Sequence, residues 1–402
     1  MARPAKVLHV LNSAGGGAAL STIGLIEALR EAGIDSCAVC HDAGSPDERE
    51  RLRESVHGEV LFIPLYWWNR KIRTALWKRP LLELRQGVHT GWGRRSASAV
   101  QRFAAERGVH LIHTNTILTP EGGFAAANAG LPHVWHIREL VGDRYPFPLA
   151  LSGRRLGAFL ERHATRLVAN SEATARLIRP LLHRELLDVV PNGIDLRSFQ
   201  PRTETTGRDR VIVAMVGSLT SRWKNHRLFV DAAARVPASR PVEFRIYGHD
   251  PVPNGNGRPD PYASGLRQAI VKCGLEGRFT FPGFVPDPAR IMSEIDILAH
   301  PAEHESFGRT AVEAMAAGLP VVGVRDGGIG EVVEHEVTGL LARPNDAHEL
   351  AAHIARLADN PEERLQMGRA GRKRAEALYS LQAHADRMLA IYQVAAEAQR
   401  QR

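Results

Sequence analysis

The chain has 402 residues, of which 44% are hydrophobic and 24% charged, as in a soluble globular protein of two or three domains. No apolar run reaches the roughly 18 residues of a membrane-spanning helix, and three cysteines are too few for a disulfide framework, so we expect a cytoplasmic location. The net charge of +8 favours an anionic partner, whether a nucleic acid, an anionic membrane or a phosphorylated substrate.

The first half of the chain alternates between strand and helix patterns. "KVLHVLNSAGGGAALSTIGLIEALREAG" predicts a strand, a glycine turn and a helix, and "DSCAVCHD" predicts the next strand. Further strand-like runs, such as "VHLIHTN" and "LPHVWHIRE", alternate with helical stretches, which predicts a parallel sheet covered on both faces. Cys37 and Cys40 face opposite sides of their predicted strand, so we interpret them as buried hydrophobic residues rather than a redox or zinc pair.

One segment, Tyr66 to Arg95, interrupts this repeat. It holds four of the six tryptophans and eight Lys or Arg residues, with Glu83 as its one acid. Aromatic and basic side chains together are typical of a surface that binds an anionic membrane. The alternatives are that they cover a core face or form a protein interface. We predict peripheral, salt-sensitive membrane binding through this segment.

A polar break, "LRSFQPRTETTGRDR", precedes a second series of strands and helices. We therefore predict an α/β fold of two doubly wound Rossmann-like domains that face each other across a cleft. The N-terminal domain spans residues 1–198 and is joined by a C-terminal helix at about 383–402, and the C-terminal domain spans 199–382. Ligands of such folds bind at the carboxyl ends of strands and between domains.

Two glutamates eight residues apart stand out in the stretch "HPAEHESFGRTAVEAMAAG". Pro301 and Gly308 disfavour a helix before about Arg309, so Glu305 falls in a loop and Glu313 on the helix that follows. A helix N-terminus attracts a phosphate, and carboxylates bind hydroxyls. The pattern predicts a sugar nucleotide, with its sugar and its ribose on either side of the diphosphate. The alternative is that both acids are solvated surface residues.

Signals for a metal or a dinucleotide are weak. His300 and His304 have the spacing of helical zinc ligands, but Pro301 disfavours a helix there. No Asp-x-Asp pair is present to hold a metal-bound diphosphate. "GGGAA", with Asp42 ending the second strand, imitates a dinucleotide fingerprint without its spacing. We expect no metal and no cofactor.

The stretch resembles the signature of the retaining glycosyltransferases of family 4, which have the B-type two-domain glycosyltransferase fold. That signature has two glutamates eight positions apart, Phe-Gly after the first, and "EAMAAGLPVV" from the second. "VAMVGSLTSRWKNH", "FPGFVPD" and "GGIGEVVEHEVTGLL" follow the family's order, and "GGGAA", "HIRE", "ANSEATARLI" and "VVPNGID" resemble its first domain. The resemblance covers nearly the whole chain and is more specific in the C-terminal half.

The resemblance implies that a hexose moves from a nucleotide-diphosphate sugar to an acceptor hydroxyl, with retention and without a metal. Glu305 would contact the hexose, Lys224 the diphosphate, Glu313 the ribose, and the backbone of Val285 the base. Ser218 replaces the family's usual arginine, and Arg222 is our candidate for the missing charge. His136 matches the family's histidine near the reacting centre, although a lone histidine is often structural.

The implied residues fall into three groups. The catalytic candidates are His136, Glu305 and Lys224. The donor-binding candidates are Gly16, Gly17, Ser218, Arg222, Gly248, Val285, Ser306, Phe307, Gly308, Arg309, Thr310 and Glu313. The acceptor-binding candidates are His113, Asn115, Arg138 and Glu139.

The expected partners are a nucleotide sugar, a lipid-linked glycan acceptor of bacterial surface-polysaccharide or glycolipid synthesis, and the inner face of the cell membrane, but no nucleic acid. Two alternatives stay open. One is an enzyme of the same fold with another reaction, such as a sugar-nucleotide epimerase or a phosphorylase. The other is a non-catalytic protein that binds sugar nucleotides.

Overall fold

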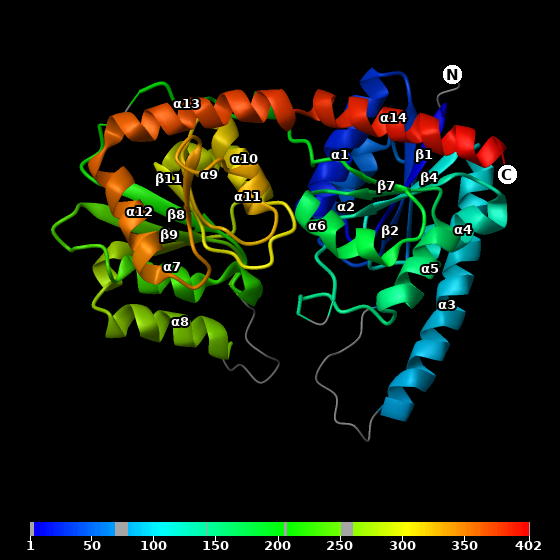
Figure 1. Ribbon diagram of the computed structural model, residues 1–402, viewed down its shortest axis with the longest axis horizontal. Coiled ribbons are helices and arrows are strands. Elements are labelled where there is room, and N and C mark those ends of the chain that lie inside the picture. The colour runs from blue at the N-terminus through cyan, green and yellow to red at the C-terminus, as the bar shows by residue number, and fades with distance from the viewer. Residues whose placement is uncertain (1–3, 69–78, 143, 205–206, 251–259, 402) are drawn as a thin grey trace. The chain divides into compact units, whose positions relative to one another are not determined.

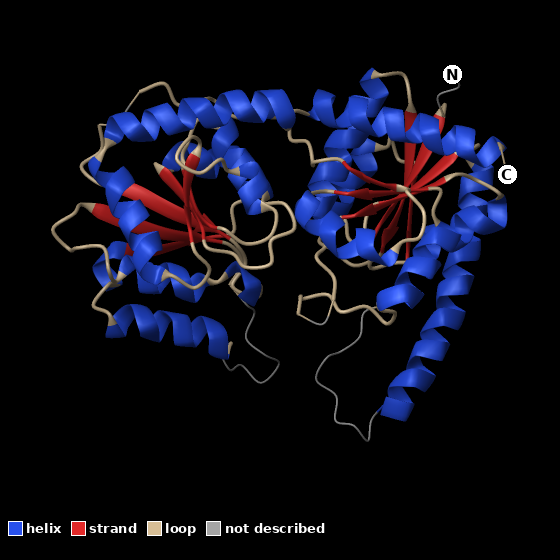
Figure 2. Ribbon diagram, in the orientation of Figure 1, coloured by secondary structure: helices blue, strands red, loops and turns tan. Residues whose placement is uncertain are grey.

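The computed structural model describes residues 4–68, 79–142, 144–204, 207–250 and 260–401, with 79–92 described by their backbone only. The chain divides into two compact units, which we call the first unit (Met1–Ile194 with Leu381–Arg402) and the second unit (Asp195–Ser380). Each is a parallel sheet enclosed by helices, as Figure 2 shows in red and blue. This confirms the predicted α/β class with two doubly wound sheets.

The first unit is built on seven parallel strands. They are β1 (Lys6–Leu11), β2 (Asp35–His41), β3 (Val60–Ile63), β4 (Leu111–Thr114), β5 (His133–Ile137), β6 (Arg166–Ala169) and β7 (Leu187–Val189). Their order is β3-β2-β1-β4-β5-β6-β7. The direction of winding reverses between β1 and β4, and loops at such a reversal diverge and leave room for a ligand.

Helices cover both faces of this sheet (Figure 1). The C-terminal helix returns to it from far along the sequence, because Ala385, Met388 and Tyr392 pack into one core cluster with Leu25 and Leu29. The helices are α1 (Gly16–Glu31), α2 (Pro46–Ser55), α3 (Arg79–Glu106), α4 (Glu121–Ala129), α5 (Gly153–His163), α6 (Glu172–Ile178), the 3-10 turn η2 (Arg179–Leu181) and α14 (Leu381–Arg400).

The second unit is built on six parallel strands. They are β8 (Val211–Val216), β9 (Val242–Tyr247), β10 (Phe279–Gly283), β11 (Ile297–His300), β12 (Val321–Val324) and β13 (Gly339–Ala342). Their order is β10-β9-β8-β11-β12-β13, so the winding reverses between β8 and β11. Such strands are almost wholly apolar because both faces of a parallel sheet are covered.

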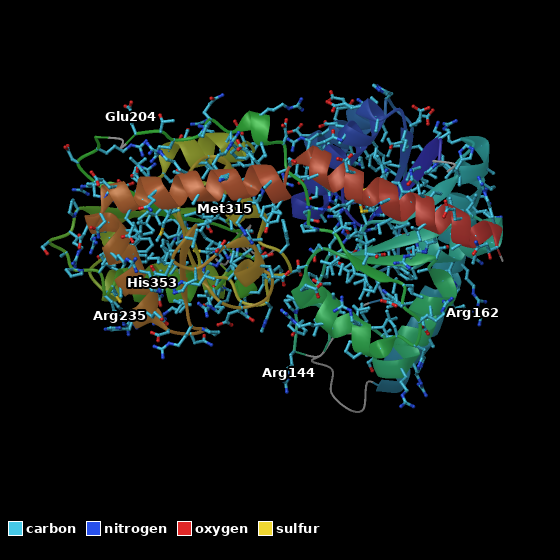
Figure 3. All side chains as sticks on the ribbon, turned by 45° about the horizontal axis from the view of Figure 1, so that its top comes forward. Arg144, Arg162, Glu204, Arg235, Met315 and His353 are labelled. Carbon is cyan, nitrogen blue, oxygen red and sulfur yellow. The ribbon has the colours of Figure 1, made fainter. Side chains whose placement is uncertain are left out.

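One helix of this unit, α10, carries Glu313 and packs against α13. Figure 3 labels Met315 of α10 beside α13, where a Cβ on Gly371 would lie 3.2 Å from the Met315 Cγ. The helices and 3-10 turns are η3 (Leu196–Ser198), η4 (Arg222–Lys224), α7 (His226–Ala233), α8 (Pro261–Lys272), η5 (Glu276–Arg278), α9 (Pro288–Glu294), α10 (Arg309–Ala316), α11 (Ile329–Val332), α12 (Ala347–Asp359) and α13 (Pro361–Leu378).

Trp68 belongs to the segment 66–95, for which we predict membrane binding, and it is partly buried. Its ring stacks on Trp135 at 6.0 Å and lies 4.7 Å from Phe159, so it packs against a core cluster of the first unit and is not available to insert into lipid. The membrane prediction for the rest of the segment stays a prediction. Trp67 is 38% exposed. The other two tryptophans of the segment lie outside the residues described with side chains. Among the described residues, no helix is long and apolar enough to cross a membrane.

The two cysteines of β2 are both buried, as the strand interpretation predicts.

Candidate functional site

In the second unit, the loops that follow β8 and β11 bring together two residues far apart in the sequence. Lys224 ends the turn η4, and Glu305 lies in the loop before α10. The Lys224 Nζ is 2.7 Å from the Glu305 Oε2. Since these loops flank the reversal of winding, the pair stands where a doubly wound sheet binds ligands.

Opposing effects set the charge of Glu305. Burial raises the pKa of its carboxyl, but Lys224, His300 and the Phe307 backbone N–H together outweigh burial and bring the pKa down to about 2. His300, the last residue of β11, has its Nε2 3.7 Å from the same carboxylate oxygen. Burial lowers the pKa of His300 to about 4, so at neutral pH the imidazole is uncharged beside an ionised pair.

Two glycines clamp the backbone of the loop that carries Glu305. The Gly328 N–H donates to the Glu305 carbonyl at 2.7 Å. A Cβ on Gly327 would lie 2.1 Å from that carbonyl oxygen, and one on Gly328 would lie 2.4 Å from the Ser306 carbonyl oxygen. Only glycine therefore permits this approach. The pair had no role in the sequence analysis, although "DGGIGE" after a predicted strand signals a close backbone contact.

The helix α10 begins at Arg309, as Pro301 and Gly308 predict. Gly308 caps it with a φ of 98° and offers no side chain to its first N–H groups. An N-terminus of this kind attracts anions. Phe307 is 4% exposed and is held edge-on by Tyr379. The predicted amides of residues 306–310 thus lie at the helix start, beside Glu305.

Glu313 lies one turn into α10 and is 3% exposed. Its Oε1 accepts from the Arg309 Nε at 2.8 Å. Burial raises the pKa of Glu313, and Arg309 opposes that rise. Glu313 is therefore buried and the Glu305 side chain is only 15% exposed, each beside a cation, which contradicts the alternative of two solvated surface acids.

The other predicted donor residues of the second unit lie in the loops after β8, β9 and β10. A Cβ on Gly248 would lie 2.2 Å from the Gly217 carbonyl oxygen, so these two strand ends touch. Ser218 bonds to Thr220 at 2.8 Å, and the exposed Arg222 stacks over the Tyr262 ring at 5.6 Å. Val285 follows Phe284, which is 54% exposed and stacks on His249.

In the first unit, Gly16 and Gly17 begin α1 directly after the β1 loop and are exposed. Gly16 has a φ of 81°, with nothing within 4 Å of a Cβ placed there. The N-terminus of α1 is thus open, as the prediction of a close ligand approach requires.

His113 and His136 lie in the interior of the first unit, and neither has any exposed area. Their rings stack at 5.5 Å, and the His113 Nδ1 is 2.7 Å from the Tyr392 hydroxyl on α14. Burial holds the pKa of both well below the usual range, with Arg138 adding to the effect. A catalytic role for His136 stays a prediction, and this setting favours the structural interpretation.

The remaining acceptor candidates hold the loops after β4 and β5 together. The Arg138 guanidinium donates to Asn115 at 3.2 Å and to Asn192. The Glu139 carboxylate accepts from Thr116 and from the Ile117 N–H. In the described part of the chain, no group of three His, Cys, Asp or Glu residues is placed to hold a metal ion.

Sequence comparison finds two matching families that together span most of the chain. Residues 197–374 match the family described as glycosyl transferases group 1, and residues 15–198 match Glycosyltransferase Family 4.

Two curated proteins illustrate the relatives. The D-inositol 3-phosphate glycosyltransferase of Mycobacterium marinum is 31% identical over 256 residues, 61% of this chain and 49% of that protein. The 2-deoxystreptamine glucosyltransferase of Streptomyces kanamyceticus is 29% identical over 225 residues, 52% of this chain and 54% of that protein. The match thus spans about half the length of these relatives.

Solved structures agree over nearly the full chain. The Anabaena protein HepE in complex with UDP and glucose superimposes with a TM-score of 0.74 at 25% identity, covering 95% of this chain and 97% of that one. Sucrose-phosphate synthase from Thermosynechococcus elongatus gives 0.72 at 23% identity, covering 96% and 98%, and shares the fold.

Proposed function

The chain belongs to the glycosyltransferases described as group 1 and family 4, and on this premise we propose that it moves a hexose from a nucleoside diphosphate sugar to an acceptor hydroxyl with retention of configuration. One observation carries the proposal: Lys224, Glu305, Glu313 and the N-terminus of α10 converge in one unit. A cation and a helix N-terminus suit a diphosphate, and carboxylates on either side suit hydroxyls.

In this assignment Lys224 and the first N–H groups of α10 hold the diphosphate, Glu305 the hexose and Glu313 the ribose. The acceptor hydroxyl attacks the anomeric carbon from the face that the diphosphate leaves, and the departing phosphate oxygen takes the proton. No carboxylate nucleophile is needed. The protein contributes position and fixed positive charge, the latter without a metal.

A thermal-shift screen of sugar nucleotides tests the donor. UDP-glucose is the first probe, because HepE was solved with UDP and glucose. A ligand at 100 times its Kd adds about 2.7 kcal/mol to the free energy of unfolding, which is readily seen as a higher Tm. A chain that no sugar nucleotide stabilises would contradict the proposal.

Incubation with the donor alone separates a transferase from an epimerase of the same fold. A transferase needs an acceptor to consume the donor at an appreciable rate, whereas an epimerase converts it without one. Rapid conversion of UDP-glucose to another UDP-hexose in the absence of acceptor would replace our assignment.

We further propose a lipid-linked glycan acceptor in bacterial surface-polysaccharide or glycolipid synthesis, reached from the inner face of the membrane. The support is the basic, aromatic composition of residues 66–95, with Trp67, Arg94 and Arg95 exposed. Wild type should float with anionic vesicles at low salt, and a Trp67→Ala/Arg94→Gln/Arg95→Gln variant should float less. Trp68 is unsuitable for this test because it packs against the core of the first unit.

Wild type that stays with the soluble fraction at low salt would remove the membrane proposal and leave the transferase assignment standing.

A further inference from the structure

His300 is a buried histidine that the fold itself does not use. It ends β11, is 4% exposed, and neither ring nitrogen has a hydrogen-bond partner in the described part of the chain. Buried polar groups without a partner are uncommon and call for an explanation. Its Nε2 lies 3.7 Å from the Glu305 Oε2, which is just beyond hydrogen-bond distance.

Lys224 and Glu305 bind each other in the ligand-free chain, yet the proposed function gives each a different ligand. Lys224 is to hold the diphosphate and Glu305 the hexose. When the diphosphate draws Lys224 away, the Glu305 carboxylate loses the cation that offsets its burial. The Phe307 backbone N–H still donates to this carboxylate, but it carries no full charge. A buried carboxylate that loses its cation is destabilised, so a further hydrogen-bond donor stabilises the donor complex.

We propose that His300 is that further hydrogen-bond donor: a positioning residue that donates its Nε2–H to Glu305 once the sugar nucleotide has engaged Lys224. The ring needs to approach by only about 1 Å to reach hydrogen-bond distance. It gives up no existing hydrogen bond in doing so. The bond leaves the other carboxylate oxygen available to the hexose hydroxyls. No proton changes hands in this step.

This inference rests on the proposed function and deepens it. Because Glu305 touches the hexose and not the diphosphate, His300 affects the binding of a sugar nucleotide but not the binding of the nucleotide alone. A purely structural histidine would affect both equally. Without a hydrogen bond in the ligand-free chain, His300 also adds little to stability that an apolar side chain of similar volume would not.

Calorimetric titration of wild type, His300→Leu and His300→Gln with UDP and with UDP-glucose tests the proposal. We expect His300→Leu to weaken the binding of UDP-glucose at least tenfold and the binding of UDP less than twofold. His300→Gln, which keeps an N–H donor, should bind both within about threefold of wild type. The ligand-free Tm of His300→Leu should equal or exceed that of wild type.

Each other outcome overturns the inference. Equal weakening of UDP and UDP-glucose, or an insoluble His300→Leu protein, would show a structural role. Unchanged UDP-glucose binding in His300→Leu, or a His300→Gln variant as weak as His300→Leu, would show that no N–H is used. If wild type binds UDP but not UDP-glucose, the inference about His300 fails and the proposed function is left standing. If it binds no nucleotide or sugar nucleotide, the proposed function fails with it.

Discussion

At Glu305 the free energy of ionisation is decided by a few close neighbours, of which Lys224 has the largest effect. Burial disfavours the carboxylate, but Lys224 at 2.7 Å, His300 and the Phe307 N–H favour it, and together they bring the pKa to about 2. The folded pKa lies below the unfolded value, so the stabilisation is present above the unfolded pKa and is lost as pH falls toward 2. Glu305 is therefore ionised and ready to accept from hydroxyls throughout the physiological range.

Removing either member of this pair should lower turnover with the fold intact. We expect Lys224→Met and Glu305→Gln each to reduce kcat/KM more than tenfold, because each removes a charge that contacts the donor in the proposed function. Lys272→Met, at an exposed position on α8, is the matched control for the lysine. Wild-type turnover in a soluble Lys224→Met or Glu305→Gln protein would remove the donor-site assignment.

Loss of Lys224 should also create a pH dependence that wild type lacks. Without that cation, the largest of the effects that oppose burial is lost, so the pKa of Glu305 rises. Wild-type affinity for UDP-glucose should be flat from about pH 5 to 8, whereas that of Lys224→Met should fall as pH decreases, because a protonated carboxyl is a poorer acceptor. Parallel profiles for the two proteins would show that Lys224 does not control the charge of Glu305.

At the scale of elements, two segments meet with no room for a side chain. The backbone after β12 lies against the loop before α10, and Gly328 faces the Ser306 carbonyl oxygen so closely that a Cβ would lie at 2.4 Å. Two residues later, on α11, a Cβ on Gly330 would meet only Arg325 Cγ, at 3.8 Å. Neither Gly328 nor Gly330 has a positive φ. The two positions therefore differ mainly in steric contact.

We expect Gly328→Ala to weaken the binding of UDP-glucose more than tenfold and to lower the Tm, because the loop that carries Glu305 must move away from the added methyl group. Gly330→Ala should bind normally and be neutral or stabilised by up to about 1 kcal/mol, since alanine is the better helix former. Thermal unfolding and titration measure both. Equal behaviour of the two variants would mean that this contact does not position Glu305.

Across the whole molecule, buried histidines are unevenly shared between the units. His9, His113, His136 and His384 come from four elements of the first unit, and none has any exposed area. Burial lowers the pKa of His9 and of His384 to about 3. Between such values and the unfolded value of about 6.5, the unfolded chain binds more protons, so the stability of the first unit falls as pH drops below about 6.5.

Each such histidine contributes up to about 1.4 kcal/mol per pH unit in that window. We expect hydrogen exchange at pH 7, 6 and 5 to show the first unit, α14 included, losing protection before the second. His136→Leu removes a titrating ring without removing a hydrogen bond and should reduce this loss, whereas His183→Leu, at an exposed position, should not. Simultaneous loss of protection in both units would contradict this account.

In the proposed function, Lys224 and the α10 N-terminus take the place of a metal ion, which sets the metal dependence of the whole protein. Because Lys224 and the α10 N-terminus offset the charge of the leaving diphosphate in the proposed function, we expect activity to survive EDTA within about twofold. The assay is initial rate before and after chelation. Loss of activity that magnesium or manganese restores would show that these groups are insufficient.

Much of this protein follows from local sequence. The βα repeats, the start of α10 at Arg309 and the loop position of Glu305 depend on hydrophobic period and on Pro and Gly, which act within a few residues. The signature of Glu305 and Glu313 indicated a sugar nucleotide before any contact was known. These features can be predicted without knowing the tertiary contacts.

The contacts that set the chemistry depend on the tertiary structure. Lys224 and Glu305 are 81 positions apart, and only the adjacent β8 and β11 bring them together. The same holds for His300, for which the sequence suggested only a weak zinc signal. It also holds for Trp68, which lies in a segment whose composition suggested a membrane surface but whose ring packs against the core of the first unit. A pKa and a burial depend on neighbours from other strands and helices, and sequence patterns along one segment do not specify those neighbours.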